Sequence, residues 1–321
     1  MNTHQLNDII KSSKNVLIVS HINPDGDTLG SMTGLFCAVK DNLKKECDMF
    51  CPSKIPAIYK FLPYIDQVKN HLQIDKSREY DLVINVDIAA KDRAGDGEVL
   101  FNKAKFTINI DHHKTNKNYG DLNIVKPEAS SCSEVLFDLL QDLNWTISPM
   151  TAAAIYTGIL TDTGGFRFDN TKAETFKAAS KLVEIGVKPI DIYKKVYESN
   201  SKNHVLFQAY CISKAVFENN DKIAYTTVYE KDIEKFSAEE DCTEGLTEKL
   251  RAIVSTEIAF VVRQMKNGGS KVSMRSKNVD VAEICSVFGG GGHTFAAGCV
   301  VKASVDETVK KILTEIKARE I

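Results

Sequence analysis

The chain of 321 residues has no apolar run long enough to cross a bilayer, and its first eleven residues are mostly polar. A membrane span needs about 18 or more consecutive apolar residues, and a secretory signal needs an apolar stretch near the N-terminus. The sequence shows neither pattern. We therefore expect a cytoplasmic protein without a membrane partner.

The cysteine spacing of a thiolate metal site is also missing. Only Cys47 and Cys51 lie close together, and no second pair accompanies them to complete a zinc site. We expect most of the cysteines to be free thiols in a reducing compartment. The eight cysteines are Cys37, Cys47, Cys51, Cys132, Cys211, Cys242, Cys285 and Cys299.

An excess of charge of either sign is absent as well, because the formal net charge is −2. This balance provides no general basic surface for duplex DNA or long RNA. The hydrophobic content of 43% is typical of globular proteins, and the length suits two domains. The composition favours a small anionic ligand over a long polyanion.

The first half of the chain alternates short apolar strands with helices. Strands are predicted over residues 16–19, 80–86 and 105–110, and helices over 28–45, 133–143, 150–160 and 171–186. This alternation indicates a parallel sheet with helices on both faces.

The second half indicates a smaller α/β unit. Strands are predicted over 223–229, 257–265 and 271–275, and helices over 246–253, 281–288 and 307–318. A helical stretch with Pro189 precedes them and reads as a connector. We predict one domain over 1–188, a helical linker over 189–217 and a second domain over 218–321.

Polar side chains follow the predicted strands of the first half. His21 follows the first strand and opens the segment HINPDGD, Asp87 follows the second, and Asp111 opens the segment DHH after the third. Because the carboxyl ends of parallel strands line one crevice, these three groups should converge. A fourth group surrounds Asp162, in a predicted loop over 161–165.

Four aspartates, at positions 25, 27, 87 and 162, could not all stay ionised in one crevice without countercharge. Two carboxylates about 4 Å apart repel by roughly 4 kcal/mol at an effective dielectric near 20. Bound divalent cations are the simplest neutraliser. Mixed histidine and carboxylate ligands favour Mn²⁺, with Mg²⁺ as the alternative. A pair of such ions is a common device for in-line attack at phosphorus.

Each segment also has an ordinary structural interpretation. Asn23–Gly26 is typical of a turn, Asp87 of a helix N-cap, and Thr161–Gly165 of a glycine turn. The adjacent histidines, His112 and His113, are harder to explain on a bare strand end. The joint pattern favours a metal site.

The order of these segments resembles the four motifs of the DHH phosphoesterase superfamily. The matching segments are HINPDGDTLGS at 21–31, the isolated Asp87, DHH at 111–113 and TDTGGFRF at 161–168. GGGGHTFAAG at 289–298, preceded by VSMR at 272–275, resembles the DHH-associated domain. The resemblance spans nearly the whole chain and is strongest to the bacterial nanoRNase/pAp phosphatase group. Family II pyrophosphatases share the first domain but lack the glycine segment.

The resemblance implies a role for each residue of the first-domain motifs. One metal ion would be held by His21 and Asp25, and the second by Asp27, His112 and Asp162, with Asp87 as the bridge between two Mn²⁺ ions. His113 would contact the scissile phosphate or protonate the leaving oxygen. Asp111 would orient the histidines from behind.

In the second domain the resemblance implies phosphate binding by Arg275, Arg263, Gly290, Gly291, Gly292 and His293. Glycines admit a phosphate close to backbone N–H groups, and arginine pairs with phosphate through its planar fork. A hinge or tight packing is the ordinary alternative for the glycines. Arg167 suits a structural ion pair as well as a substrate contact. The active site is expected in the cleft between the domains.

The implied function is hydrolysis of short single-stranded oligoribonucleotides to mononucleotides, and of 3′-phosphoadenosine 5′-phosphate (pAp) to AMP and phosphate. An alternative is a phosphodiesterase for cyclic di-AMP or its linear product pApA. A pyrophosphatase or polyphosphatase is disfavoured by the glycine segment, and a non-catalytic RNA-binding module by the complete ligand set. Stable binding of duplex DNA is not expected, and the family leaves a homodimer open.

Overall fold

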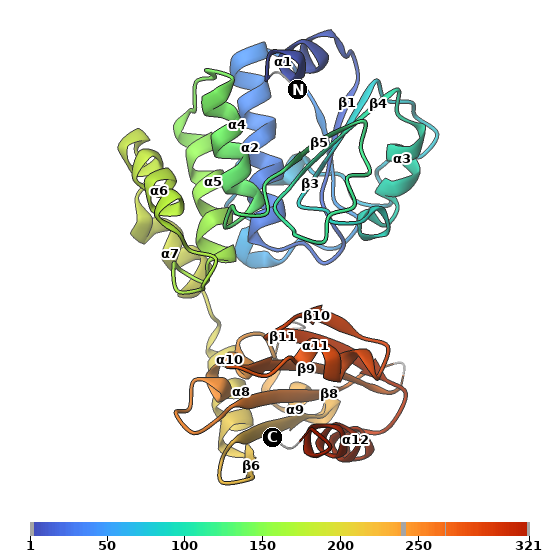
Figure 1. The fold of residues 1–321 in the computed structure, drawn as a ribbon, viewed down its shortest axis with the longest axis vertical. Helices are drawn as coiled ribbons and strands as arrows, with labels where there is room; N and C mark the ends of the chain where they lie inside the picture. The colour runs from blue at the N-terminus through green and yellow to red at the C-terminus, as the bar shows by residue number, and fades with distance from the viewer. Residues whose placement is uncertain (1–2, 239–241, 267, 320–321) are drawn as a thin grey trace. The chain divides into compact units, whose positions relative to one another are not determined.

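The computed structural model describes residues 3–238, 242–266 and 268–319 and divides the chain into two compact units, Met1–Ser199 and Asn200–Ile321. Each unit has its own sheet (Figure 1). Within the stretch predicted as a linker, α7 (Pro189–Tyr197) falls in the first unit and α8 (Lys202–Ser213) in the second. The division between the units therefore lies between these two helices.

The sheet of the first unit has five parallel strands in the order β2-β1-β3-β4-β5. Its strands are β1 (Val16–Val19), β2 (Asp48–Phe50), β3 (Leu82–Val86), β4 (Phe106–Asp111) and β5 (Leu122–Val125). Every residue of β1 and β3 is buried, as predominantly apolar runs predict for central parallel strands, although β3 includes the polar Asn85. The predicted parallel sheet is confirmed. The edge strands β2 and β5 were not predicted, because they are short and partly exposed.

Helices cover both faces of this sheet, as predicted (Figure 1). Alternate residues of β1 show the two faces, since Ile18 joins the core beneath α2 and Val19 joins the core around Phe101 of α3. The helices of the first face are α2 (Gly26–Leu43), α4 (Cys132–Asp142) and α5 (Pro149–Asp162), and the opposite face carries α3 (Gly97–Lys103). The other elements of the unit are α1 (Thr3–Ser12), α6 (Ala173–Ile185), η1 (Ala57–Tyr59), η2 (Ile65–Gln67) and η3 (Lys91–Ala94).

Helices α2 and α5 pack with almost no room between their backbones. A Cβ atom at Gly30 would lie 2.5 Å from the carbonyl oxygen of Ala154, and one at Gly26 would lie 2.4 Å from Oγ1 of Thr161. Both positions therefore require glycine. The close packing brings the N-terminus of α2 beside the C-terminus of α5, where two of the predicted ligand segments meet.

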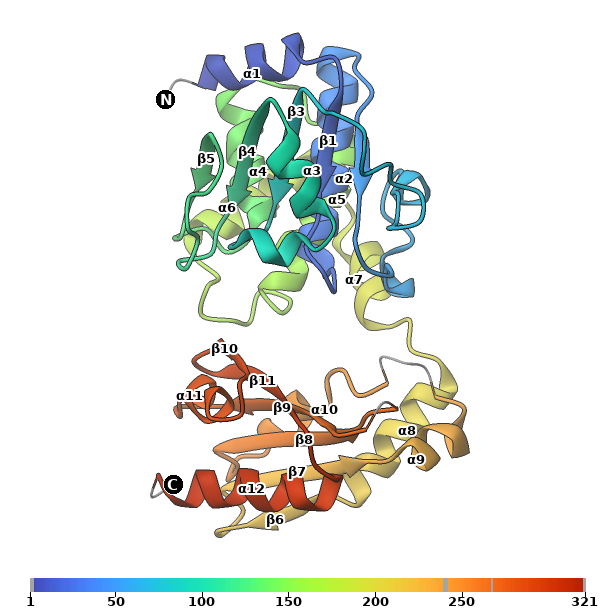
Figure 2. The same cartoon turned by 90° about the vertical axis from the view of Figure 1, so that its right-hand side faces the viewer.

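The second unit contains a mixed six-stranded sheet in the order β10-β11-β9-β8-β7-β6, in which only the β7–β8 pair is parallel. Its strands are β6 (Val216–Glu218), β7 (Ile223–Val228), β8 (Ile258–Gln264), β9 (Ser270–Ser276), β10 (Gly291–His293) and β11 (Ala296–Val301). One face packs on α11 (Val281–Ser286) and α12 (Val305–Lys317), which runs along the sheet in Figure 2. The other face packs on α8 and α10 (Leu246–Arg251), and α9 (Glu230–Phe236) lies beside α8.

Two predictions from composition can be compared directly with the structure. No disulfide joins any of the eight cysteines, most of which were predicted to be free thiols. Within the part of the chain that the structure describes, no helix has the length and apolar character needed to span a membrane.

Candidate active site

Three neighbouring strands of the first sheet end at the same edge with polar residues. His21 lies just beyond β1, Asp87 directly follows β3, and Asp111 is the last residue of β4. In chain order, β2 is added on one side of β1 and β3 on the other. The carboxyl ends of β1 and β3 therefore flank the topological switch point, where open α/β sheets bind ligands.

The first group of donor atoms lies around His21. Its Nδ1 is 2.8 Å from the carbonyl oxygen of Ile22, which directs Nε2 towards the carboxylates. That Nε2 lies 3.4 Å from Oδ2 of Asp87 and 3.8 Å from Oδ1 of Asp25. Asp25 also caps α2, because its Oδ1 accepts hydrogen bonds from the backbone N–H groups of Asp27 and Thr28. The capping role corrects the interpretation of this segment as a simple turn.

The second group lies around His112. Its Nε2 is 3.5 Å from Oδ1 of Asp87, 3.6 Å from Oδ2 of Asp162 and 3.9 Å from Oδ2 of Asp27. Two donor atoms that bind one ion at about 2.1 Å stand about 3.0–3.5 Å apart. The spacings in both groups are close to this range, so each group could hold a metal ion after small movements.

Asp87 stands between the two groups and is 4% exposed. Its Oδ2 faces His21 and its Oδ1 faces His112, so the two oxygens point to different groups. Oδ1 is buried and accepts no hydrogen bond from any residue that the structure describes. A buried oxygen without a donor is costly unless a cation lies beside it. The residues present therefore fit a bridged pair of metal ions.

The backbone of Asp87 has a φ of 60°, a conformation that costs a non-glycine residue about 1–3 kcal/mol and is common at functional sites. The alternative role of Asp87 as a helix N-cap is wrong, because the next helical segment, η3, has Ala90 at that position.

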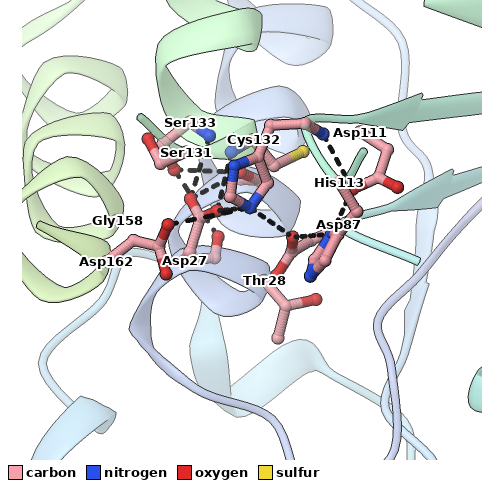
Figure 3. A network of polar contacts seen from close by, with 12 residues as sticks. Asp27, Thr28, Asp87, Asp111, His113, Ser131, Cys132, Ser133, Gly158 and Asp162 are labelled. Carbon is pink, nitrogen blue, oxygen red and sulfur yellow. Dashed lines mark hydrogen bonds and ion pairs between the residues drawn. The ribbon is translucent and has the colours of Figure 1, made fainter. Parts of the chain in front are cut away.

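Asp27 is fixed by the first turn of α4. Its Oδ2 accepts a hydrogen bond from the backbone N–H of Cys132 (2.7 Å) and its Oδ1 accepts one from that of Ser133 (2.9 Å), as Figure 3 shows. The side chain of Ser131 caps the same helix through the N–H of Glu134. Sequence reasoning did not identify this support, although Ser131 and Glu134 have the spacing of a capping box.

Asp162 is the last residue of α5 and does not lie in a loop, which corrects the prediction for this segment. The side-chain amide of Asn170 donates a hydrogen bond to the carbonyl oxygen of Asp162 (3.1 Å) and to that of Ser130 (2.9 Å). The glycine turn follows the helix, with positive φ at Gly164 and Gly165. The apolar helix therefore extends two residues further than its pattern indicated.

His113 is paired with the fully buried Asp111. Its Nδ1 lies 2.7 Å from Oδ1 of Asp111, and the backbone N–H of His112 donates to the same oxygen (2.8 Å). Burial tends to raise the pKa of Asp111, but the hydrogen bond and charge of His113 outweigh it, and the net pKa is lowered. Asp111 is thus ionised and Nδ1 of His113 is its donor.

The other carboxylates of the cluster repel one another. Burial raises the pKa of Asp87 and of Asp162 well above the ordinary value, and neighbouring carboxylates raise both further. Burial also raises the pKa of Asp27. Such crowding of buried carboxylates is typical of a site that a cation completes.

Two predicted residues of the second unit lie in one cross-strand row. Arg275 on β9 and His293 on β10 both pair with Ala296 on β11, which lies between them. The guanidinium of Arg275 forms an ion pair with Glu248 of α10 (2.9 Å) and donates to the carbonyl oxygen of Met274. Arg263 lies four residues along β8 from the partner of Arg275, about 13 Å away at strand rise. The structure does not bring Arg263 together with Arg275.

Gly289 and Gly290 lie in the turn after α11, and Gly291 and Gly292 belong to the short strand β10. The N–H of Gly290 donates to the carbonyl oxygen of Cys285 (2.9 Å), and a Cβ atom there would lie 2.2 Å from the carbonyl oxygen of Gly298. A Cβ at Gly292 would meet Ala296 in the same way. At Gly291 a Cβ would meet no atom within 4 Å. Packing therefore explains Gly290 and Gly292, but it does not explain Gly291.

Arg167 makes a local contact. Its Nε donates to the carbonyl oxygen of Gly164 (2.6 Å), and its guanidinium lies 5.9 Å from the ring centre of Phe168. These contacts hold the turn that follows Asp162.

The comparisons with known proteins agree with this architecture. The sequence model of the DHH family N-terminal domain matches residues 15–159, and that of the DHHA1 domain matches residues 220–319. The chain is therefore a phosphoesterase of the DHH class. It belongs to the members that carry a DHHA1 domain after the DHH domain, and it is a hydrolase that acts on phosphoester bonds. The family predicted from the motifs is confirmed.

Named relatives cover most of the chain. The bifunctional oligoribonuclease and PAP phosphatase NrnA of Thermus thermophilus is 29% identical over 94% of this chain and 89% of its own. The cyclic-di-AMP phosphodiesterase GdpP of Bacillus subtilis is 27% identical over 97% of this chain but only 48% of its own. The crystal structure of an exopolyphosphatase-related protein from Bacteroides fragilis superposes with a TM-score of 0.92 at 25% identity, covering 98% of this chain and 95% of that one.

Proposed function

We propose that this chain hydrolyses short single-stranded oligoribonucleotides to mononucleotides and removes the 3′-phosphate of pAp, with two Mn²⁺ ions in the first unit. The observation that carries the proposal is the buried carboxylate of Asp87, whose two oxygens face two separate groups of histidine and carboxylate donors. The relatives named NrnA, which align along nearly their whole length, support the choice of substrates.

The donor atoms of the two groups favour Mn²⁺, with Mg²⁺ as the alternative, because they are imidazole nitrogens and carboxylate oxygens without a thiolate. His21 and Asp25 would hold one ion, Asp27, His112 and Asp162 the other, and Asp87 both. When bound, such a pair activates a water and neutralises charge on the phosphate oxygens.

Residues of the chain would donate the proton that the leaving oxygen needs and would orient the group that donates it. Nδ1 of His113 donates to Asp111, so Nε2 is the ring nitrogen that can serve the substrate. We propose that His113 protonates the leaving oxygen through Nε2. The ionised Asp111 favours the protonated imidazole that this step requires, because burial of His113 alone would lower its pKa whereas Asp111 raises it.

The second unit would bind a neighbouring phosphate of the substrate. We propose that Arg275, Gly291 and His293 form this site, with Gly290 and Gly292 shaping the backbone and Arg263 as a more distant contact. An arriving phosphate would replace Glu248 as the partner of Arg275. A site for one phosphate suits substrates of a few nucleotides and agrees with the small net charge of −2.

The test is hydrolysis of a 5′-labelled RNA trimer and of pAp by metal-stripped protein, before and after Mn²⁺ is restored. We expect both substrates to disappear only with metal, and Asp87→Ala to abolish both reactions. Disappearance without metal, or normal turnover by the variant, would contradict the proposed centre.

Cyclic di-AMP is the second candidate substrate, because the relative named as its phosphodiesterase aligns with 97% of this chain. The same assay with cyclic di-AMP and pApA ranks the candidates. Turnover of the cyclic compound above that of pAp and trimer would replace the first proposal with the second while leaving the metal centre intact.

We also propose a cytoplasmic location, because eight free thiols suit a reducing compartment. A homodimer stays a prediction, which sedimentation of the purified protein would test.

A further inference from the structure

We propose that Asn116 is a positioning residue for the reaction, which holds Asp111 in the orientation that directs His113 towards the substrate. The kinetic part of this proposal rests on the proposed function, whereas its spectroscopic part does not.

The side-chain amide of Asn116 can adopt only one orientation. Its Oδ1 accepts a hydrogen bond from the backbone N–H of Asn118 (2.7 Å), while its Nδ2 faces oxygen atoms alone. These oxygens are Oδ2 of Asp111, Oδ1 of Asn109 (2.6 Å) and, further away, the carbonyl oxygen of Ile88 (3.3 Å). Exchanging the oxygen and nitrogen would place like partners together on both sides.

Asp111 divides its two oxygens between the active site and this amide. Oδ1 accepts from Nδ1 of His113 and from the backbone of His112, and Oδ2 accepts from Asn116. Asp111 has no exposed surface, so the amide takes the place that water would otherwise fill. Without the amide, Oδ2 would lose the donor that holds it, and the carboxylate could rotate away from His113.

The amide is held in turn by hydrogen-bonded groups of β4 and of the segments that follow β3 and β4. The carbonyl oxygen of Ile88 also accepts hydrogen bonds from Asn109 (3.1 Å) and from the hydroxyl of Tyr119 (2.9 Å). The backbone N–H of Asn116 donates to the carbonyl oxygen of His113 (3.1 Å). Asn116 is therefore fixed from the core and cannot follow Asp111 if that residue rotates. Such outer contacts of an active site typically contribute about 10–100-fold to activity.

Asn116→Ala and Asn116→Ser test the proposal, with Asn118→Gly as the matched control. Serine can still accept from the N–H of residue 118 and keep the turn, but it cannot reach Asp111 with an amide. Asn118 lies on the same turn, is exposed and has a φ of 48°, which glycine adopts readily. The control thus removes an amide without touching Asp111.

We expect both Asn116 variants to lower kcat for pAp by about 10–100-fold and to leave KM within about twofold, whereas the control keeps wild-type kcat. In a His113→Ala background the same Asn116 substitutions should change kcat by less than about twofold, since the residue they position is gone. An equal loss in both backgrounds, or a loss confined to KM, would overturn the proposal.

Nitrogen-15 NMR of the histidine rings in metal-free protein provides the second measurement. We expect a hydrogen-bonded Nδ1–H resonance, assigned to His113 by its loss in His113→Ala, to persist in Asn118→Gly and to vanish or broaden in both Asn116 variants. An unchanged resonance in the Asn116 variants would contradict the proposal. This result does not depend on whether pAp and RNA are substrates. If one of the two Asn116 variants does not fold, the other is used for both measurements.

Discussion

The two units of this protein prepare their candidate sites in opposite ways. In the first unit most of the donor side chains are buried or half-buried, with Asp25 exposed. Several are held from behind, as Asp27 is by the start of α4 and His113 by Asp111. In the second unit the candidate site consists of an arginine in a replaceable ion pair and an edge strand of glycines. The first arrangement suits concentrated charge, which must be held rigidly. The second suits a phosphate that must enter and leave.

The largest expected effect comes from Asp87→Asn, which removes charge from the centre of the buried cluster. We expect turnover to fall by about a thousandfold or more, because both ions lose a shared ligand. The metal-free variant should nevertheless be more stable than metal-free wild type, since burial and nearby carboxylates destabilise the ionised form of Asp87. Thermal unfolding of both stripped proteins measures the difference.

The pH dependence of that difference follows from the raised pKa of Asp87. The folded protein binds the proton of Asp87 more tightly than the unfolded chain does. The stabilisation from protonated Asp87 is therefore complete below about pH 3.9, the pKa in the unfolded chain, and is lost as the pH rises through the pKa of Asp87 in the folded protein. The variant should therefore gain on wild type as pH rises. A constant difference from pH 4 to pH 8 would show that Asp87 is not strained.

Arg275→Ala should act on binding and leave the chemistry intact. Loss of a hydrogen-bonded ion pair with phosphate corresponds to about 1.5–3 kcal/mol, so we expect KM for pAp to rise about 10–100-fold with kcat nearly unchanged.

Glu248→Gln is the matched control for Arg275, because it releases the guanidinium from its ion pair without removing it. We expect this variant to bind pAp as tightly as wild type or more tightly. Steady-state kinetics of the two variants would contradict the role of Arg275 if both raised KM equally, since the ion pair would then be structural.

The smallest expected effects distinguish Gly291 of β10 from Gly290, which precedes this strand. Gly290→Ala places a methyl group against the backbone of Gly298 and should lower the free energy of unfolding by about 1–3 kcal/mol. Gly291→Ala meets no neighbour and should leave stability within about 0.5 kcal/mol of wild type. Under the proposed function it should still raise KM for pAp severalfold, and an unchanged KM would remove Gly291 from the site.

Much of the first unit was predictable because its signals are local. The apolar strands that end in His21, Asp87 and Asp111 indicated a parallel sheet with its polar groups at one edge, and the structure confirms the sheet. The predicted helices and strands end within about two residues of the observed positions.

The supports of the site were not predictable, because they join residues far apart in the chain. Asp27 accepts from backbone groups 105 and 106 residues away, and no local pattern reports such a contact. In the second unit, the strand β10 was missed because glycines have no side chains to show an alternating period. Asp162 was assigned to a loop because Gly164 and Gly165 follow it closely.

The central claim is a pair of metal ions that share Asp87, and anomalous diffraction at the manganese edge tests it most directly. Crystals grown with Mn²⁺ should show two anomalous peaks, one beside His21 and Asp25 and one beside Asp27, His112 and Asp162, with a carboxylate oxygen of Asp87 at each. A single peak, or two peaks that do not both contact Asp87, would contradict the account.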